Sequence, residues 1–176
     1  ERGTFRPALA RLDEQADLLM LAGDLTNLGT REEARIVAEE FGELPVPVVA
    51  VLGNRDHHGD HPEEVAAILR RAGSPVLEGQ GTVVTAGGAR VGVAGVKGFG
   101  GGFSPARGHV FGERQMKQFI GHSREVAGAL ENALHALDTE YRIALMHYAP
   151  VPETLRGEPE EIYPFLGSEY LAEAVD

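Results

Sequence analysis

Two polar residues, Asp24 and Asn54, each follow a glycine at the end of an apolar run. The runs, Leu18–Gly23 and Val48–Gly53, are continuous rather than alternating, which is typical of strands buried on both faces. Glycine lets the backbone turn sharply, so each polar side chain can rise clear of the sheet edge. Because carboxylate and amide oxygens bind divalent cations, the pair predicts a metal site at the C-terminal ends of two strands. The alternative is that each pair forms an ordinary turn.

A third candidate ligand, His147, follows the apolar run Ile143–Met146. Asp, Asn and His arriving from three strand ends would make half of a divalent metal site. A lone histidine at a strand end is more often hydrogen-bonded than metal-bound, but the presence of Asp24 and Asn54 favours a ligand role for His147. The chain has no cysteine, which excludes disulfides, thiolate ligands and a cysteine nucleophile together.

The composition of the 176-residue chain fits a single domain over residues 1–176. A formal net charge of -11 argues against binding nucleic acid through its phosphates. A small phosphorylated substrate stays compatible with that charge, because a bound dication would dominate the local field. Since no apolar segment approaches the roughly 18 residues of a membrane span and no leader is evident, we expect a cytoplasmic protein without membrane partners. The oligomeric state is left open.

Strands and helices alternate at both ends of the sequence, with a hairpin in the middle. Strands are predicted over 17–22, 47–52 and 142–147, a hairpin over 82–86 and 90–96, and helices over 31–42, 63–72 and 113–138. The end of a further helix is predicted at 5–15 and the start of another at 168–176. Thr30 and Glu33 form a capping-box pattern, and Pro62 is placed to open a helix. This order predicts an α/β layered fold with a mixed sheet.

Three sequence blocks resemble those of a known family, the calcineurin-like metallophosphoesterases. The family pattern is D-x-H, G-D-x-x-[DN], G-N-H-[DE], a histidine after a strand, and G-H-x-H; the matching residues here are Gly23-Asp24-Leu25-Thr26-Asn27, Gly53-Asn54-Arg55-Asp56 and His147. The resemblance covers most of the chain and implies a four-layer α-β-β-α sandwich. It also implies two divalent ions, manganese, iron or zinc, bridged by Asp24, with Asn54 and His147 binding the second. The implied activity is hydrolysis of a phosphomonoester or phosphodiester by a metal-bound hydroxide.

Two family blocks have no match in this sequence. The D-x-H block would precede residue 1 and the G-H-x-H block would follow Asp176. We therefore expect an interior piece of a longer chain, lacking three histidines and one aspartate of the metal shell. Such a piece should bind metal weakly or at one site only.

Arg55 stands where the family has its histidine, and Asp56 follows it. Arginine cannot give up a proton near neutral pH, but it can bind phosphate oxygens as a bidentate fork. Protonation of the leaving group would then pass to water or to another residue, with His57 and His58 as candidates. Asp56 is expected either to orient Arg55 through a salt bridge or to cap the turn. Arg55 and Asp56 are accordingly the candidate catalytic residues.

The glycine-rich segment Val96–Phe103 begins like a dinucleotide-binding fingerprint. Its last position is a phenylalanine and no helix is predicted to start there, so a loop beside the site is the better interpretation. Three function hypotheses remain. They are a metal-dependent phosphoesterase, a non-catalytic binding or scaffold relative, and a nucleotide-binding α/β domain without hydrolysis.

Overall fold

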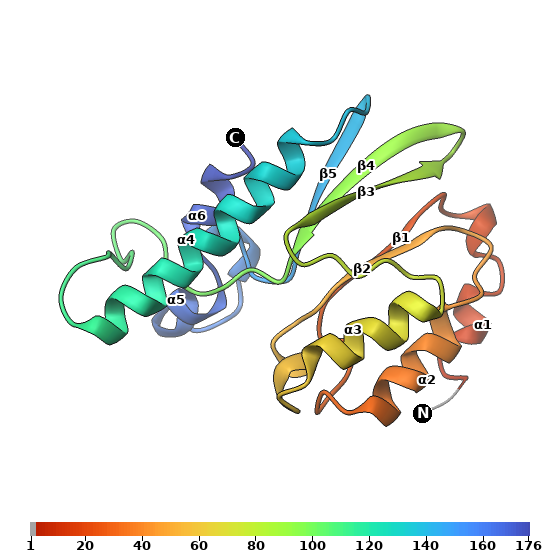
Figure 1. Cartoon of the computed structure of the whole chain (residues 1–176), viewed down its shortest axis with the longest axis horizontal. Coiled ribbons are helices and arrows are strands. Elements are labelled where there is room, and N and C mark those ends of the chain that lie inside the picture. The colour runs from red at the N-terminus through yellow and green to blue at the C-terminus, as the bar shows by residue number, and fades with distance from the viewer. Residues whose placement is uncertain (1–2) are drawn as a thin grey trace.

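The computed structural model describes residues 3–176, whose strands form two sheets (Figure 1). In the first sheet, β1 (Leu19–Ala22) and β2 (Val48–Val51) run parallel. In the second, β3 (Gln80–Ala86) and β4 (Ala89–Val96) form an antiparallel hairpin, and β5 (Tyr141–Met146) pairs with β4 in parallel. The predicted α/β class with a mixed sheet is therefore confirmed.

Ten helical segments lie in the described part of the chain. They are α1 (Arg6–Leu9), η1 (Leu12–Glu14), α2 (Arg31–Phe41), η2 (Arg55–His57), α3 (Pro62–Arg71), α4 (Arg114–His135), η3 (Pro152–Leu155), η4 (Glu160–Ile162), α5 (Tyr163–Leu166) and α6 (Glu169–Glu173). The helix predicted over 5–15 is instead two short pieces, because Arg11 leaves the helical region with φ -129 and ψ 36. The predicted capping box is confirmed, since Thr30 and Glu33 bond reciprocally at the start of α2.

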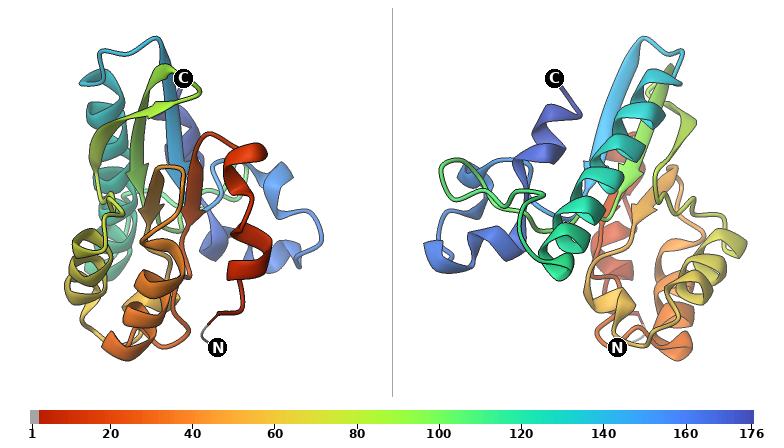
Figure 2. Two further views of the ribbon diagram at one scale, coloured as in Figure 1. Left: turned by 90° about the vertical axis from the view of Figure 1, so that its right-hand side faces the viewer. Right: turned by 60° about the vertical axis from the view of Figure 1, so that its left-hand side comes forward.

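The apolar residues of β2 divide between two cores because side chains alternate along a strand. Ala50 and Leu52 pack with residues of α2 and α3, whereas Val49 and Val51 pack with residues of the second sheet. This explains why the run is apolar without alternation. α2 and α3 pack beside the first sheet and α4 packs against the second (Figure 1 and Figure 2).

A third core cluster joins the second sheet to the C-terminal helices. Ala94 and Val96 of β4 pack there with Leu130 of α4 and Leu171 of α6. The strands are thus held by helices on both outer faces, and β1 and β2 both contact β5. Residues that follow these three strands are brought to one edge of the molecule. Among residues 3–176, none of the helices combines the length and the hydropathy that a bilayer crossing requires.

Candidate metal centre

Asp24, Asn54 and His147 come together at the C-terminal ends of β1, β2 and β5. His147 Nε2 lies 3.0 Å from Asn54 Oδ1 and 3.4 Å from Asp24 Oδ1. The sequence predicts that these residues bind a metal ion. The structure places their electron-pair donor atoms close together. We call this group the metal centre.

Two glycines make this convergence sterically possible. A Cβ on Gly53 would stand 2.1 Å from Asp24 N and 2.3 Å from Asp24 Oδ1. A Cβ on Gly23 would stand 2.6 Å from His147 Nδ1, and Gly23 also has φ +90. Asp24 itself has φ 51, a left-handed conformation that aspartate tolerates better than most residues. The glycines therefore allow the close approach of strand ends as well as the turn.

The hydrogen bond on the far side of the His147 ring fixes the tautomer of the neutral imidazole. His147 Nδ1 lies 2.8 Å from Ala22 O, and a carbonyl oxygen can only accept, so Nδ1 carries the hydrogen. Nε2 then turns a lone pair toward the oxygens of Asp24 and Asn54. Facing lone pairs are repulsive unless a cation or a proton lies between them, and orientation of a ligand histidine through Nδ1–H is usual in metal sites.

The donor set fits one divalent cation. Ligand atoms bound at about 2.1 Å in tetrahedral or octahedral geometry stand about 3.0 to 3.4 Å apart, as these do. Carboxylate, amide and imidazole suit manganese, iron and zinc alike. In residues 3–176 no group of three His, Cys, Asp or Glu side chains could hold a metal ion, and the third candidate ligand here is Asn54.

Arg55 is held against the metal centre by its own neighbours. Its backbone N–H donates to Asp24 Oδ1 at 3.0 Å, and its Nε lies 3.4 Å from Asp24 Oδ2. Its Nη1 donates to Asn27 Oδ1 at 2.7 Å. The guanidinium thus lies beside the candidate ligand, where a phosphoryl group bound to a cation would need positive charge.

Asp56 is fully buried and fixes two loops to each other. Its carboxylate accepts from Thr26 N at 2.7 Å, Thr26 Oγ1 at 2.6 Å, Leu25 N at 3.2 Å and Gly53 N at 2.7 Å. No ion pair between Asp56 and Arg55 is found in the described residues, so the expected salt bridge is absent from this geometry. The bond to Gly53 N agrees with the alternative expectation of a turn cap, and the other bonds reach across to the loop after β1.

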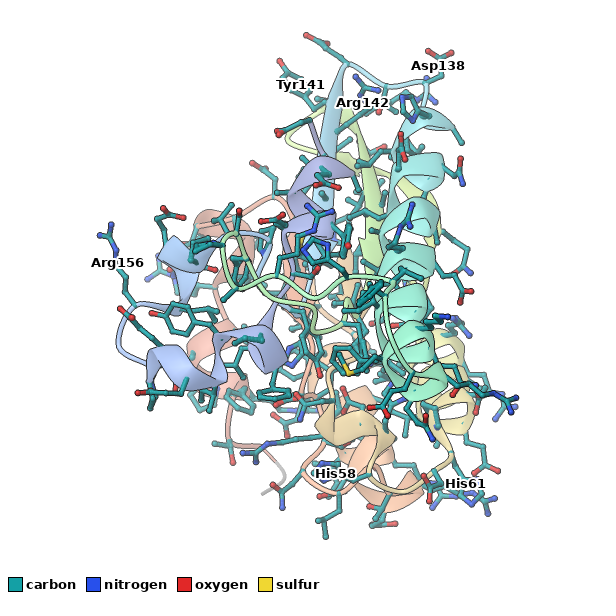
Figure 3. The ribbon with its side chains drawn as sticks, turned by 90° about the vertical axis from the view of Figure 1, so that its left-hand side faces the viewer. His58, His61, Asp138, Tyr141, Arg142 and Arg156 are labelled. Atoms are coloured by element: carbon teal, nitrogen blue, oxygen red, sulfur yellow. The ribbon has the colours of Figure 1, made fainter. Side chains whose placement is uncertain are left out.

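The two histidines considered as proton donors do not line the pocket at the metal centre. His58 and His61 lie at one extremity of the molecule in Figure 3. His57 lies in η2, where burial, followed by the positive charge of Lys97, lowers its pKa. The backbone N–H of His57 donates to Asn54 O at 3.2 Å, but its ring does not line the pocket.

A pocket of about 760 Å³ opens beside the metal centre and contains Arg55. Its far wall is formed by the chain after His147, including Leu155 and Phe165. This wall is held in place, because Tyr163 OH donates to Leu155 O at 3.0 Å and Ala149 N to Leu166 O at 3.0 Å. The sequence predicts only a loop for this segment, since helical turns of three or four residues show no periodicity.

Tyr148 and Arg156 also line the pocket. Burial, with a smaller contribution from the negative charge of Asp24, raises the pKa of the Tyr148 phenol. Arg156 projects outward at the edge of the molecule (Figure 3), so it forms part of the rim.

The glycine-rich loop after β4 packs against the C-terminal helices and does not open a helix. Gly101 N donates to Pro164 O at 2.8 Å and Gly102 N to Gly167 O at 3.0 Å. Farther along, Arg107 pairs with Glu169 and Glu173. Since α4 begins only at Arg114, the weak dinucleotide-binding pattern lacks its helix.

The sequence matches the calcineurin-like phosphoesterase family over residues 3–172. No curated protein matches it. The matched range contains the metal centre, Arg55, Asp56 and nearly all of the described structure. The chain belongs to the calcineurin-like phosphoesterase family.

Proposed function

We propose that this protein is a metal-dependent phosphoesterase that hydrolyses a phosphomonoester or a phosphodiester. The observation that carries the proposal is the approach of the Asp24 and Asn54 side-chain oxygens to within 3.0 to 3.4 Å of His147 Nε2 at one pocket. Family membership supports it, because the family consists largely of phosphoesterases that bind divalent metals. A bound divalent cation would supply Lewis-acid polarisation of a phosphoryl oxygen and acidification of water.

Each residue of the site has a separate role in this proposal. Asp24, Asn54 and His147 would hold the cation. Arg55 binds phosphoryl oxygens and offsets the negative charge that grows on them during the reaction. Asp56 positions the metal centre by fixing the loops that carry Asp24 and Asn54.

The proton for the leaving group comes from water in this proposal. Arg55 cannot donate one, and His57 and His58 do not line the pocket. Without a positioned acid, hydrolysis should depend steeply on the acidity of the leaving group. Esters with acidic leaving groups are therefore the best substrates for a first assay.

The proposal extends to the layers of the fold, the class of substrate and the cellular location. We propose the four-layer α-β-β-α sandwich, which agrees with core clusters on both sides of each sheet. A small phosphorylated substrate, rather than a nucleic acid, is supported by the pocket and by the net charge of -11. A cytoplasmic location stays a prediction from the sequence.

The test is an assay of the protein with manganese, using p-nitrophenyl phosphate and bis(p-nitrophenyl) phosphate. Calorimetry on the same sample measures whether manganese is bound. We expect turnover of at least one ester, and this turnover should disappear when a chelator is added. Asp138→Asn changes an exposed residue far from His58 and His61 in Figure 3 and should leave the turnover unaltered.

A second candidate function is a non-catalytic binding module, favoured by Arg55 in the place of the family's histidine. Measured manganese binding without turnover of either ester would contradict the phosphoesterase proposal and support this candidate.

A further inference from the structure

The pocket beside the metal centre is larger than a phosphoryl group alone requires. Its volume of about 760 Å³ lies in the range of roughly 300 to 1,000 Å³ that is usual for pockets enclosing whole organic ligands. If the phosphoryl group lies at the metal centre, as the proposed function requires, the organic part of the ester lies against the far wall. The residues of the far wall therefore bear on the class of the substrate.

Most of the far-wall residues that line the pocket are apolar. They are Ala149, Pro150, Leu155, Phe165 and Leu166. The two charged residues of this wall, Arg156 and Glu158, have opposite signs, so the wall carries no net charge. Because a charged group would lose hydration here without a net opposite charge to replace it, the wall suits an uncharged organic group.

Phe165 presents an aromatic surface to this pocket. The residue is 64% exposed and lies in α5. Within residues 3–176 its ring packs on no other aromatic ring. Two aromatic rings in an offset or edge-to-face arrangement gain free energy beyond the burial of apolar area. The wall therefore favours an aromatic ring over an aliphatic group of similar size.

The backbone that carries Phe165 is held in place by the glycine-rich loop. A Cβ on Gly100 would stand 2.7 Å from Pro164 O and 3.2 Å from Phe165 Cα, so this loop packs directly against α5. Gly101 N also donates to Pro164 O. A ligand therefore meets a wall that is already formed, which lowers the entropy cost of binding.

The chemistry at the metal centre favours the same kind of ester. Arg55 cannot give a proton to the leaving group, and His57 and His58 do not line the pocket. A phenol such as that of tyrosine has a pKa of about 10, whereas aliphatic alcohols are far weaker acids. An aryl oxide therefore leaves much more readily without a positioned proton donor.

We propose that this pocket selects aryl phosphoesters, with the phosphoryl group at the metal centre and the aromatic ring against Phe165. In hydrolysis the oxygen of water forms a bond to phosphorus, and the bond from phosphorus to the aryl oxygen breaks. Water leaves a hydroxyl on the phosphoryl group and gives its other proton to the solvent, from which the departing phenolate takes one. The proposal rests on the proposed phosphoesterase function, but the preference for an aromatic ring can be measured without turnover.

The experiment is calorimetry of the manganese-loaded protein with phenylphosphonate, cyclohexylphosphonate and methylphosphonate. Their carbon–phosphorus bonds are not hydrolysed, so binding is measured apart from catalysis. We expect phenylphosphonate to bind at least about threefold more tightly than cyclohexylphosphonate, and methylphosphonate to bind most weakly. Burial of apolar area alone predicts no advantage for the phenyl ring. Equal or weaker binding of phenylphosphonate, or no binding of any of the three, would overturn the proposal.

Paired variants locate the preference. Phe165→Leu keeps an apolar side chain without a ring, so the phenyl preference should disappear while methylphosphonate affinity stays within about twofold. Phe165→Tyr keeps the ring and should keep the preference. Phe111→Leu changes a residue that is 84% exposed and does not line the pocket, and it should behave like the parent. A full preference in folded Phe165→Leu would overturn the assignment; if that variant misfolds by circular dichroism, the comparison of ligands in the parent decides.

The outcomes separate this proposal from the phosphoesterase function. A phenyl preference without turnover of p-nitrophenyl phosphate or bis(p-nitrophenyl) phosphate would support the ring site and overturn the phosphoesterase function. Turnover of either ester without a phenyl preference would overturn the aryl assignment alone.

Discussion

The metal centre and a second cavity both contain histidine and a carboxylate. The second cavity, called the rear cavity, is lined by His57, Glu78, Lys97 and His122. In the metal centre the groups face one another at 3.0 and 3.4 Å with lone pairs converging. In the rear cavity the Lys97 ammonium lies near the Phe99 and Tyr148 rings, and Glu78 accepts a hydrogen bond from Leu52 N. The two regions differ in residue type as well as in spacing, because Lys97 has no counterpart in the metal centre. A cation suits the metal centre, where lone pairs converge.

The two regions achieve their spacing by different means. The metal centre uses short side chains whose positions are set by the backbone, through Gly23, Gly53 and the buried Asp56. The rear cavity uses the long side chains of Lys97 and Glu78, whose charged ends lie several bonds from the backbone. We expect the metal centre to be sensitive to backbone changes and the rear cavity to changes of charge.

Asp24→Ala should have the largest effect. It removes the only carboxylate of the metal centre, so manganese affinity should fall by at least about a hundredfold. Calorimetry measures the affinity, and Asp138→Ala is the control. An unchanged manganese affinity in Asp24→Ala would contradict the assignment of Asp24.

Gly53→Ala tests the claim that backbone approach builds the metal centre. The new Cβ would lie 2.1 Å from Asp24 N, which forces the strand ends apart. A displacement of that kind should lower manganese affinity by about tenfold or more. The matched control is Gly121→Ala in α4, where a Cβ meets nothing within 4 Å and should stabilise the helix by about 0.5 to 1 kcal/mol. Unchanged manganese affinity in Gly53→Ala would contradict the claim.

Arg55→His tests the absence of a proton donor at the metal centre. A histidine can protonate a leaving group, so turnover of esters with weakly acidic leaving groups should rise by about tenfold or more relative to p-nitrophenyl phosphate. The measurement is the slope of kcat/KM against leaving-group pKa in the parent and the variant. Arg55→Met removes the charge without adding a donor and should leave the slope steep. An equal slope in Arg55→His would show that another group already protonates the leaving group.

The smallest effect concerns His57 and the pH dependence of stability. Burial and the charges of Lys97 and His122 lower its pKa, while Asp56 and Glu63 oppose the change. The unfolded chain therefore takes up this proton first, and stability is lost as pH falls from the ordinary histidine range through the folded pKa. His57→Gln should flatten this part of the urea-unfolding profile, whereas His61→Gln, an exposed change, should not. Identical slopes in the parent and His57→Gln would contradict the buried, neutral state.

Much of the fold was predictable because its signals are local. Continuous apolar runs identified β1, β2 and β5, and the pattern at Thr30 and Glu33 placed the start of α2. The break in the N-terminal helix and the helical turns over 152–166 were missed, because pieces of three or four residues carry no periodicity. The bonds of Asp56 to Thr26 and Gly53 were not predictable in full either, because Thr26 lies 30 residues away in the sequence.

The sequence by itself determined which residues could form the metal centre. A glycine and a polar residue after an apolar run identified Asp24 and Asn54, and a histidine directly after an apolar run identified His147. Only the tertiary structure decided their mutual distances, the bond of His147 to Ala22 and the contacts of Arg55. The rear cavity was decided there entirely, since its four side chains come from distant segments. Whether two charges form an ion pair depends on how those segments pack, and a local sequence pattern does not predict that packing.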